Sequence, residues 1–324
     1  MTRERLSNEN KISRVLFVGL NYYHYPEAIS RGLERLGYQV DYYPIEPRTL
    51  FYKISRYILN PLYRASLDRY HRNIISQSSS IKYDKVFFIT THFFSIDNLK
   101  YLRNSQENAE FISYHWDPLS HYNYLGTVSF FDRTYSFDSV DCKKYGFKYL
   151  PLFASGIYDN IEQKEHDIDI YTVASLSGTQ RYILAQQFKD YCISNDIKFY
   201  FHLKVTPINY LKILLQGLVP KDVSLRILEP EVMRDIVTRS RAVLDIRNHQ
   251  QSGLTMRVIE NICIGKKIVT TNEHIINESF YDKNQIFLLG KDNIDDLKAF
   301  IYSEYKPRQR PELKIEFWLK SIFQ

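Results

Sequence analysis

An arginine and a glutamate three positions apart are the residues of this sequence best suited to bind and transfer a charged group. Arg257 and Glu260 stand in a segment where Met256, Ile259 and Cys263 recur at helical spacing. They therefore share one face in the first turns of a predicted helix, where unpaired backbone N–H groups favour an anion. Arg257 could fork onto a diphosphate, and Glu260 could accept hydrogen bonds from ribose hydroxyls. An ordinary i,i+3 ion pair on an exposed helix fits the same spacing.

The segments on either side of this helix predict a βαβ unit. Residues 242–246 form a short apolar run typical of a buried parallel strand, and the polar residues after them end it. Gly265 supplies a stop for the helix, and the β-branched run at 268–270 starts the next strand. The loop before the helix therefore leaves the carboxyl end of a parallel strand, where open sheets of this kind bind ligands.

Two runs carry a resemblance to a known family, SGLTMRVIE at 252–260 and GKKIV at 265–269. They resemble the donor-nucleotide motif of glycosyltransferases with the GT-B fold, in particular those of lipopolysaccharide or capsular polysaccharide biosynthesis. Gly253 and Glu260 match the glycine and the second acidic residue of that motif, whereas Ser252 replaces the first acidic residue. Because the replaced glutamate contacts the donor sugar in many retaining members, its absence argues against retaining chemistry, although the sequence alone does not decide between inverting and retaining transfer. Residues 131–138, 148–152 and 168–181 extend the resemblance, which covers about 113–289.

The resemblance implies an α/β protein of two Rossmann-like domains facing a cleft, with a C-terminal helix that crosses back to the first domain. It implies transfer of a sugar from a nucleotide-sugar co-substrate, with no other cofactor, to a glycan or lipid-linked acceptor of a cell-surface polysaccharide. The donor nucleotide would be bound around Ser252, Gly253, Thr255, Arg257 and Glu260. One rival is transfer of a non-sugar group from an activated nucleotide. The other is a catalytically silent GT-B-like protein that binds a glycan, a lipid surface or a partner enzyme.

The order of apolar runs agrees with two α/β domains, which 324 residues are enough to build. Strands of the first domain are predicted at 14–18, 38–43, 85–90, 110–114, 133–137 and 147–150. Those of the second are predicted at 168–173, 198–203, 224–227, 242–246, 267–270 and 286–289. We therefore expect an acceptor domain at 1–153, a charged linker at 154–167, a donor domain at 168–305, and a returning helical segment at 306–324.

Further donor-site candidates follow other strands of the second domain. After the strand at 168–173, Gly178 would allow close backbone approach and Arg181 would meet phosphate oxygens. Lys204 is a second candidate cation, although a solvated lysine at a strand end is the commoner outcome. In the resembling family the region of Glu229 lies near the nucleobase, and capping of a helix N-terminus is the alternative.

The first domain is expected to hold the acceptor and the catalytic base. An inverting transfer needs a base near neutral pH to deprotonate the acceptor hydroxyl, and Asp117 is the first candidate, with His92 the second. Both follow predicted strands. Trp116 could stack on an acceptor sugar or lipid-linked group, or else fill the space under its loop. His115 and Asn21 complete the acceptor-binding candidates.

No metal-binding pattern stands in the predicted cleft. Residues 166–169 include histidine and aspartates, but they lie at the linker and the start of a strand. The cysteines Cys142, Cys192 and Cys263 are widely spaced and match neither a metal site nor a disulfide framework, which favours a reducing compartment. We expect a metal-independent enzyme in which Arg257, Arg181 and a helix N-terminus stabilise the departing diphosphate.

A formal charge of +6 and a pI near 8.9 fit either an anionic membrane surface or nucleic acid. Basic residues gather between Thr49 and Ile75 among aromatic and aliphatic ones, which suits an interfacial segment on anionic lipid. Because Pro61 divides this stretch, two helices packed on the first domain with a solvated basic face are the alternative. Nucleic acid is not expected, since no recognition module is visible.

The expected location follows from the absence of long apolar runs. None approaches the roughly twenty residues that span a bilayer, and residues 1–10 are polar rather than signal-like. A cytoplasmic protein, peripheral on the inner face of the membrane, is therefore expected.

Overall fold

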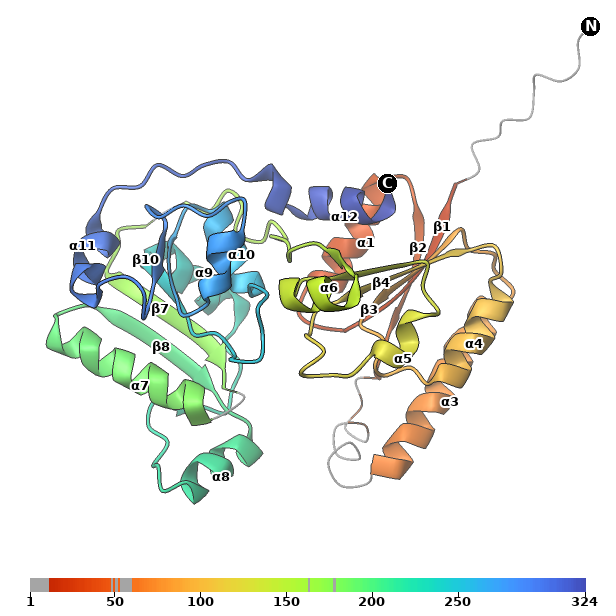
Figure 1. Ribbon diagram of the computed structural model, residues 1–324, viewed down its shortest axis with the longest axis horizontal. Helices are drawn as coiled ribbons and strands as arrows, with labels where there is room; N and C mark the ends of the chain where they lie inside the picture. Colours follow the sequence, from red (N-terminus) through yellow and green to blue (C-terminus); the bar gives the residue numbers. More distant parts are fainter. Residues whose placement is uncertain (1–11, 48, 50–51, 53–59, 163, 177–178) are drawn as a thin grey trace, which may run out of the picture. The chain divides into compact units, whose positions relative to one another are not determined.

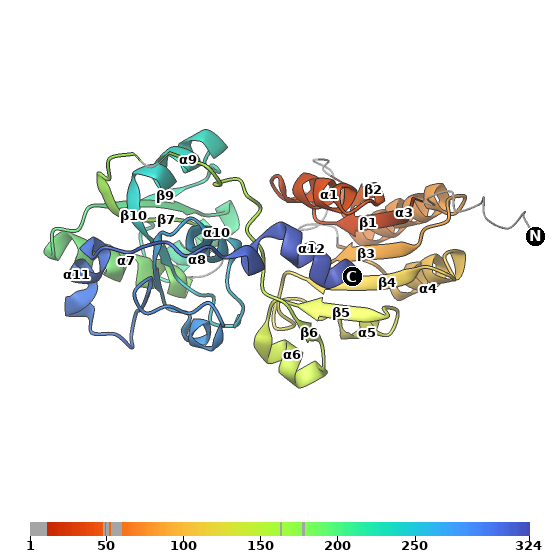
Figure 2. The same ribbon diagram turned by 90° about the horizontal axis from the view of Figure 1, so that it is seen from above.

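The computed structural model describes residues 12–47, 49, 52, 60–162, 164–176 and 179–324. The chain divides into two units. Unit 1 comprises Met1–Pro151 with Ile315–Gln324, and unit 2 comprises Leu152–Lys314. Each unit contains a parallel sheet of six strands with helices packed against it (Figures 1 and 2).

Unit 1 alternates strands and helices along the chain. Its strands are β1 (Arg14–Gly19), β2 (Gln39–Pro44), β3 (Lys85–Ile89), β4 (Glu110–His115), β5 (Arg133–Ser136) and β6 (Lys148–Tyr149). Its helices are α1 (Tyr25–Arg35), α3 (Asn60–Ser78), α4 (Ile96–Ser105), α5 (Leu125–Val128), α6 (Ser139–Tyr145) and α12 (Ile315–Phe323). The strand order β2-β1-β3-β4-β5-β6 reverses between β1 and β3, which makes that point the expected ligand crevice of this sheet.

Both faces of the unit 1 sheet are buried, as the continuous apolar runs predict. Leu16 and Val18 of β1 point into a cluster with residues of α3 and α4. Phe87 of β3 faces the other way, and its ring contacts Trp318 and Phe323 of α12. Figure 1 accordingly shows α3 and α4 on one side of the sheet and α1 and α12 on the other.

Unit 2 has the same alternation in a different strand order. Its strands are β7 (Ile168–Ser175), β8 (Phe199–Lys204), β9 (Val223–Ser224), β10 (Ser240–Asp245), β11 (Lys267–Thr270) and β12 (Ile286–Leu288). Its α-helices are α7 (Thr179–Ser194), α8 (Pro207–Leu215), α9 (Pro230–Arg239), α10 (Met256–Cys263) and α11 (Leu297–Tyr302), with short 3₁₀ turns η1 (Glu273–Asn277), η2 (Ile294–Asp296) and η3 (Pro311–Leu313). The order β12-β11-β10-β7-β8-β9 is that of a dinucleotide-binding sheet, and it reverses between β7 and β10.

One predicted strand is wrong. Residues 224–227 were expected to be extended within the sheet, but only Val223–Ser224 pairs with β8. The hydroxyl of Ser224 accepts a hydrogen bond from the backbone N–H of Arg226 at 3.0 Å, and this local bond turns the chain away from the sheet. Leu225 and Ile227 are consequently exposed.

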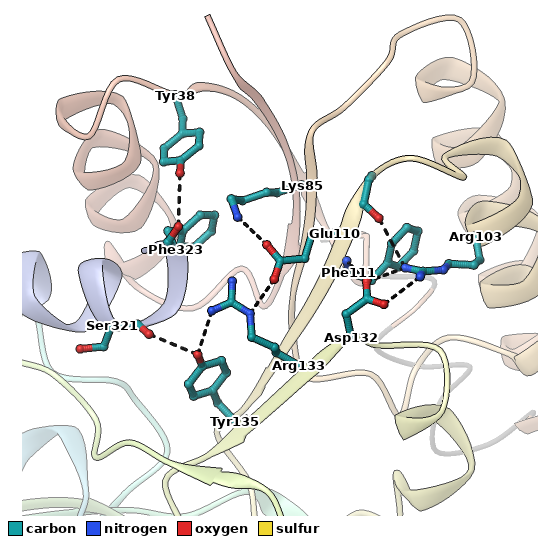
Figure 3. A network of polar contacts seen from close by, with 11 residues as sticks. Tyr38, Lys85, Arg103, Glu110, Phe111, Asp132, Arg133, Tyr135, Ser321 and Phe323 are labelled. Atoms are coloured by element: carbon teal, nitrogen blue, oxygen red, sulfur yellow. Dashed lines mark hydrogen bonds and ion pairs between the residues drawn. The ribbon is translucent and has the colours of Figure 1, made fainter.

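The C-terminal helix α12 belongs to unit 1, as the resemblance implies. A polar network at the amino-terminal edge of the sheet holds it there (Figure 3). Glu110 of β4 accepts hydrogen bonds from Lys85 of β3 at 2.5 Å and from Arg133 of β5 at 2.6 Å. Tyr135, which contacts the same arginine, donates to the carbonyl of Ser321 at 3.2 Å. This network lies at the edge where the strands begin. The loops that follow the strands lie at the opposite, carboxyl edge of the sheet.

Residues 60–75 of the basic stretch belong to α3. Its residues Tyr63, Leu67 and Ile74 are buried against the unit 1 core, whereas Arg64 and Arg69 are exposed. Arg48, Lys53 and Arg56 lie outside the described residues. Within α3 the apolar side thus faces the protein and the basic side faces solvent, which corresponds to the packed-helix alternative for this stretch.

Candidate active site

The loops that follow β7 and β10 meet at the switch point of the unit 2 sheet. The two strands are hydrogen-bonded neighbours, with Ala242 beside Ile170 and Val243 beside Tyr171. The chain leaves β7 toward α7 and leaves β10 toward α10, so both helices begin at the same edge of the sheet. This edge is where sheets of this order bind nucleotides.

Two arginines come to this edge, Arg181 in the first turn of α7 and Arg257 in the first turn of α10. Each has a buried Nε atom to which the described residues offer no hydrogen-bond acceptor. Burial lowers the pKa of Arg181, the carboxylate of Asp245 opposes that shift, and the charge of Arg257 adds to it. Both arginines therefore stand at the same sheet edge, where the charge of Arg257 acts on Arg181. Nη1 of Arg181 donates to the carbonyl of Ser175 at 3.1 Å, which leaves the Nε–H groups as donors for an anion.

Asp245 and Thr255 build the N-terminus of α10. Thr255 is the N-cap, and its hydroxyl accepts the backbone N–H of Val258 at 3.4 Å. The same hydroxyl donates to Asp245 at 3.1 Å, and Thr270 of β11 donates to the other oxygen of Asp245 at 3.1 Å. Asp245 was not singled out from the sequence. The feature of the sequence that could have pointed to Asp245 is the position of an acidic residue near the end of a buried apolar strand.

Glu260 lies one turn further along α10 and is only 7% exposed. It accepts a hydrogen bond from Ser155 at 3.1 Å. Beside it, Tyr171 donates to Asn261 at 3.0 Å, and Asn261 donates to the carbonyl of Arg257 at 2.9 Å. Burial raises the pKa of Tyr171, and the charge of Arg257 opposes this. Glu260 is thus part of a buried polar cluster, unlike a solvated residue of an exposed helix face.

The glycine-containing loop before α10 is fixed from the neighbouring strand. Ser252 and Gly253 are buried, and the side-chain amide of Asn272, just after β11, donates to their carbonyl oxygens at 3.0 and 3.3 Å. Because this amide holds two consecutive carbonyls, the loop has a defined position at the sheet edge. Asn272 is a second positioning residue that the sequence pattern did not reveal.

The remaining donor candidates are more dispersed. Lys204 is the last residue of β8 and stands next to Ser175 of β7 in the sheet register. Glu229 is the exposed N-cap residue of α9. Gly178 lies outside the described residues. Their nucleotide-binding roles stay predictions.

In unit 1 the corresponding edge contains backbone strain. Thr90, immediately after β3, has a φ of +64°, a conformation that a β-branched residue rarely adopts. Its N–H donates to the carbonyl of Tyr114 at 2.8 Å, and its hydroxyl lies 3.0 Å from Nδ1 of His92. Tyr23, in the loop after β1, also has a positive φ, of +50°. Strain of this kind is concentrated at functional sites, and both loops flank the β1–β3 switch point.

The two base candidates have aromatic or ionisable neighbours. The ring of His92 stacks on that of Tyr122, with centroids 3.9 Å apart. Asp117 lies 3.8 Å from Nδ1 of His121, and both side chains are partly exposed. The turn that brings them together is closed by the N–H of His121 donating to the carbonyl of Pro118 at 2.9 Å. The Asp-Pro pair was the available signal for such a turn, and His121 was missed.

The acceptor candidates differ in accessibility. His115 is fully buried, its ring lies 3.5 Å from that of Tyr124, and burial lowers its pKa to about 3. It is therefore a neutral residue packed beneath the loop. The ring of Trp116 meets that of Tyr25 edge-on at 5.7 Å.

Asn21 begins the loop that carries two exposed tyrosines, Tyr22 and Tyr23. Their rings pack against each other at 4.3 Å. A pair of exposed rings on one loop offers apolar faces on which a sugar or a lipid-linked group can stack. The acceptor-binding roles of these residues stay predictions.

The described part of the chain has neither a metal-binding cluster nor a membrane-spanning helix. It contains no group of three or more His, Cys, Asp or Glu side chains arranged to hold a metal ion. In the metal-like run at 166–169, Asp167 pairs with Arg239, and Asp169 accepts the N–H of Lys198 at 2.8 Å. No helix among the described residues is both long and apolar enough to span a bilayer.

Comparison with known proteins identifies the fold. No protein-family model matches the chain, and no curated protein matches it significantly in sequence. The apo form of the lipopolysaccharide outer core galactosyltransferase WaaB is 12% identical, with a TM-score of 0.50, over 96% of this chain and 95% of WaaB. AviGT4, a glycosyltransferase involved in avilamycin A biosynthesis, is 11% identical, with a TM-score of 0.56, over 96% and 93% of the two chains. The chain has the GT-B fold.

The same fold is found in a protein assigned a different activity. A Listeria monocytogenes structure assigned as a UDP-N-acetylglucosamine 2-epimerase is 10% identical, covers 90% of this chain and 88% of its own, and has a TM-score of 0.52. At these identities the similarity establishes the GT-B fold, and the activity has to be argued from the residues of the site.

Proposed function

We propose that this GT-B protein is a glycosyltransferase that moves a sugar from a nucleotide-sugar donor to a glycan or lipid-linked acceptor. The observation that carries the proposal is the convergence of Arg181 and Arg257 at the switch-point edge of unit 2. Each has a buried Nε atom without an acceptor among the described residues. A diphosphate supplies negatively charged oxygens that match such forked donors.

The chemistry follows from where charge develops. As the bond between the anomeric carbon and the phosphate oxygen breaks, the diphosphate leaves with the electron pair and gains negative charge. Arg181, Arg257 and the N-terminus of α10 would stabilise that charge, and they would do so more strongly in the transition state than in the ground state. Glu260 would bind ribose hydroxyls from the next turn of the helix.

The acceptor would be bound at the carboxyl edge of unit 1. In an inverting transfer, its hydroxyl oxygen forms the new bond to the anomeric carbon while its proton passes to a base. Asp117 is the proposed base, and His121 lies 3.8 Å from it, near enough to act on it electrostatically. His92 is the second candidate. Trp116 and the exposed rings of Tyr22 and Tyr23 offer apolar faces for a sugar or a lipid-linked group.

We also propose that the product is a cell-surface polysaccharide or glycolipid and that the protein works at the cytoplasmic face of a membrane. The sequence resemblance and the similarity in fold to WaaB support this assignment. The basic face of α3 would then be an electrostatic contact with anionic lipid, because its apolar side is already buried.

A nucleotide and nucleotide-sugar panel tests the proposed activity. Thermal shifts with UDP, GDP, dTDP and CMP would select the nucleotide, and hydrolysis of the matching nucleotide sugars would then report catalysis. The Arg181→Gln variant should show neither the thermal shift nor the hydrolysis. The Arg234→Gln variant, which changes an exposed arginine of α9, should show both. Nucleotide binding without sugar release would favour a silent binding protein, and interconversion of nucleotide-sugar epimers would favour an epimerase.

A further inference from the structure

Helix α8 carries apolar side chains on the side that faces solvent. Ile208, Leu211, Leu214 and Leu215 are 47%, 55%, 40% and 78% exposed, whereas Ile213 is buried in the unit 2 core. At 100° per residue, Ile208, Leu211 and Leu215 fall within about 60° of one another around the helix axis. Helices of globular proteins normally bury their apolar stripe, so α8 has an additional apolar face without a covering element among the described residues.

This face continues beyond the helix and stands out from the fold. Val219, in the segment after α8, is 67% exposed. In Figure 1, α8 lies at the margin of unit 2, beyond α7 and the end of β8. The five residues Ile208, Leu211, Leu214, Leu215 and Val219, together with Lys212 and Lys221, are called the α8 surface below.

The α8 surface is held in place by specific hydrogen bonds. Thr206 caps the helix by accepting the N–H of Asn209 at 3.2 Å, and the side chain of Asn209 donates to the carbonyl of Leu176 at 2.9 Å. The hydroxyl of Tyr182 donates to the carbonyl of Val219 at 3.2 Å and accepts the N–H of Lys221 at 2.9 Å. The exposed apolar side chains therefore project from an anchored element.

The charges beside this face are positive. Lys212 is the only charged residue of α8, and Lys221 follows it in the connecting segment. Asp222 is the next acidic residue, and it is paired with Lys189 of α7. Apolar side chains flanked by lysines match the boundary of an anionic bilayer. The apolar side chains would contact acyl chains, and the lysines would contact the negatively charged headgroups.

We propose that the α8 surface docks on an anionic lipid bilayer, with the leucines and isoleucine in the interfacial region and the lysines on the headgroups. A second copy of the chain fits this surface less well. A two-fold contact of the surface with itself would place Lys212 and Lys221 of both copies in one interface, and the α8 surface has no acidic residue to pair with them.

Docking at α8 would place the donor site close to the lipid. Asn209 of α8 bonds directly to Leu176, in the loop that leads from β7 to Arg181. The α8 surface and the paired arginines therefore share the carboxyl edge of the same sheet. The inference deepens the proposed membrane location, but it does not depend on sugar transfer, because its test measures vesicle binding rather than turnover.

The test is co-sedimentation of the full chain with vesicles of phosphatidylcholine alone or with added phosphatidylglycerol. Wild-type protein should bind the anionic vesicles and bind the neutral ones more weakly. The double variant Leu211→Gln, Leu215→Gln should lower the partition coefficient by about tenfold or more, since two apolar side chains no longer enter the interface. Lys212→Gln with Lys221→Gln should reduce binding to anionic vesicles and weaken its dependence on salt.

Two control variants make the outcome decisive. Ile183→Gln with Ile193→Gln replaces exposed apolar residues of α7 in the same unit and should leave binding unchanged. Arg64→Gln with Arg69→Gln removes charge from α3, and loss of binding there but not in the α8 variants would overturn the proposal. It would also be overturned by equal binding to both vesicle types, or by concentration-dependent dimerisation that the α8 double variant abolishes.

Discussion

The hydroxyl of Thr255 donates a hydrogen bond of 3.1 Å to Asp245, joining the N-cap of α10 to the end of β10. Asp245 also accepts from Thr270 and lies near the guanidinium of Arg181. One carboxylate thus connects two adjacent strands and the start of a helix, and its charge acts on one of the two arginines of the candidate site. The geometry of the donor site depends on this connection as well as on the arginines themselves.

Thr255 therefore provides a test of how the helix N-terminus is held. Thr255→Val should lower the free energy of unfolding by about 1 to 2 kcal/mol, because both the cap and the bond to Asp245 are lost. Thr255→Ser keeps a hydroxyl at the same place and should stay within about 0.5 kcal/mol of wild type. Urea unfolding of the three proteins measures the difference. Equal stability of the valine and serine variants would mean that the hydroxyl contributes nothing.

Arg257 should contribute to transfer more than to folding. Arg257→Ala removes the charged donor proposed to stabilise the leaving diphosphate, so kcat/KM for the donor should fall by an amount equivalent to about 2 to 4 kcal/mol. Arg234→Ala is the matched control, because that arginine is exposed on α9 of the same unit. Steady-state kinetics with the preferred nucleotide sugar gives the result. If the Arg257 variant has wild-type kinetics, Arg257 does not stabilise the leaving diphosphate.

The order of apolar runs predicted the two sheets, and the helical spacing of Met256, Ile259 and Cys263 predicted the helix that carries Arg257 and Glu260 at a sheet edge. These features are local, because a buried parallel strand and a helix N-terminus have short sequence signals. The contacts that fix the site are not local. Asn272 donates to the carbonyls of Ser252 and Gly253, which are 20 and 19 residues before it in the sequence. Ser155 donates to Glu260, which is 105 residues after it.

Sequence patterns also do not reveal which apolar residues remain uncovered. In the predicted strand at 224–227, Leu225 and Ile227 alternate with polar residues. In the structure, Leu225 and Ile227 are exposed at the edge of the sheet instead. Whether an apolar side chain is buried depends on the element that packs against it, and that element comes from elsewhere in the chain.

The catalytic base can be assigned by comparing three variants. Asp117→Asn should reduce turnover by about 100-fold or more while nucleotide binding survives, because the loop keeps its shape but loses the proton acceptor. His121→Gln should give a smaller loss if it only assists Asp117. His92→Ala serves as the competing candidate. Full activity of Asp117→Asn together with an inactive His92 variant would assign the role to His92.

The stability of unit 1 should depend on pH through its buried histidines. Burial lowers the pKa of His115 from its ordinary value of 6.5 to about 3, and that of His71 to about 4. The unfolded chain then binds protons below pH 6.5 that the folded chain does not bind. Above pH 6.5 each neutral histidine makes its full contribution to the free energy of unfolding. Below pH 6.5 the free energy of unfolding falls by about 1.4 kcal/mol per pH unit for each histidine, until the pH reaches the folded-state pKa of that histidine.

A substitution at His115 tests this dependence. His115→Phe should flatten the fall in unfolding free energy between about pH 7 and about pH 5, because a ring without a titratable nitrogen remains stacked on Tyr124. His249→Gln, at an exposed histidine, should leave the slope as in wild type. Urea unfolding across this range gives both slopes. Parallel curves for wild type and His115→Phe would show that His115 does not titrate on unfolding.

The docking of the C-terminal helix onto α1 should depend on the absence of a side chain at Gly32. A Cβ added there would lie 2.3 Å from Cδ1 of Leu319, which is fully buried in α12. Replacing a helical glycine by alanine is normally stabilising by up to about 1 kcal/mol, but overpacking a buried contact costs about 1 to 3 kcal/mol. We therefore expect Gly32→Ala to destabilise the protein. Gly126→Ala in α5, where the nearest atom is 3.8 Å away, should be neutral or stabilising.

A double variant distinguishes this contact from a general effect on α1. Leu319→Ala alone should destabilise through the cavity it leaves, by about 2 to 5 kcal/mol. Combined with Gly32→Ala, the loss should be smaller than the sum of the two single effects, because the added methyl group then occupies part of that cavity. Thermal or urea unfolding of the four proteins gives the coupling. If the two single changes in free energy of unfolding add exactly, the effect of Gly32→Ala does not arise at the contact between α1 and α12.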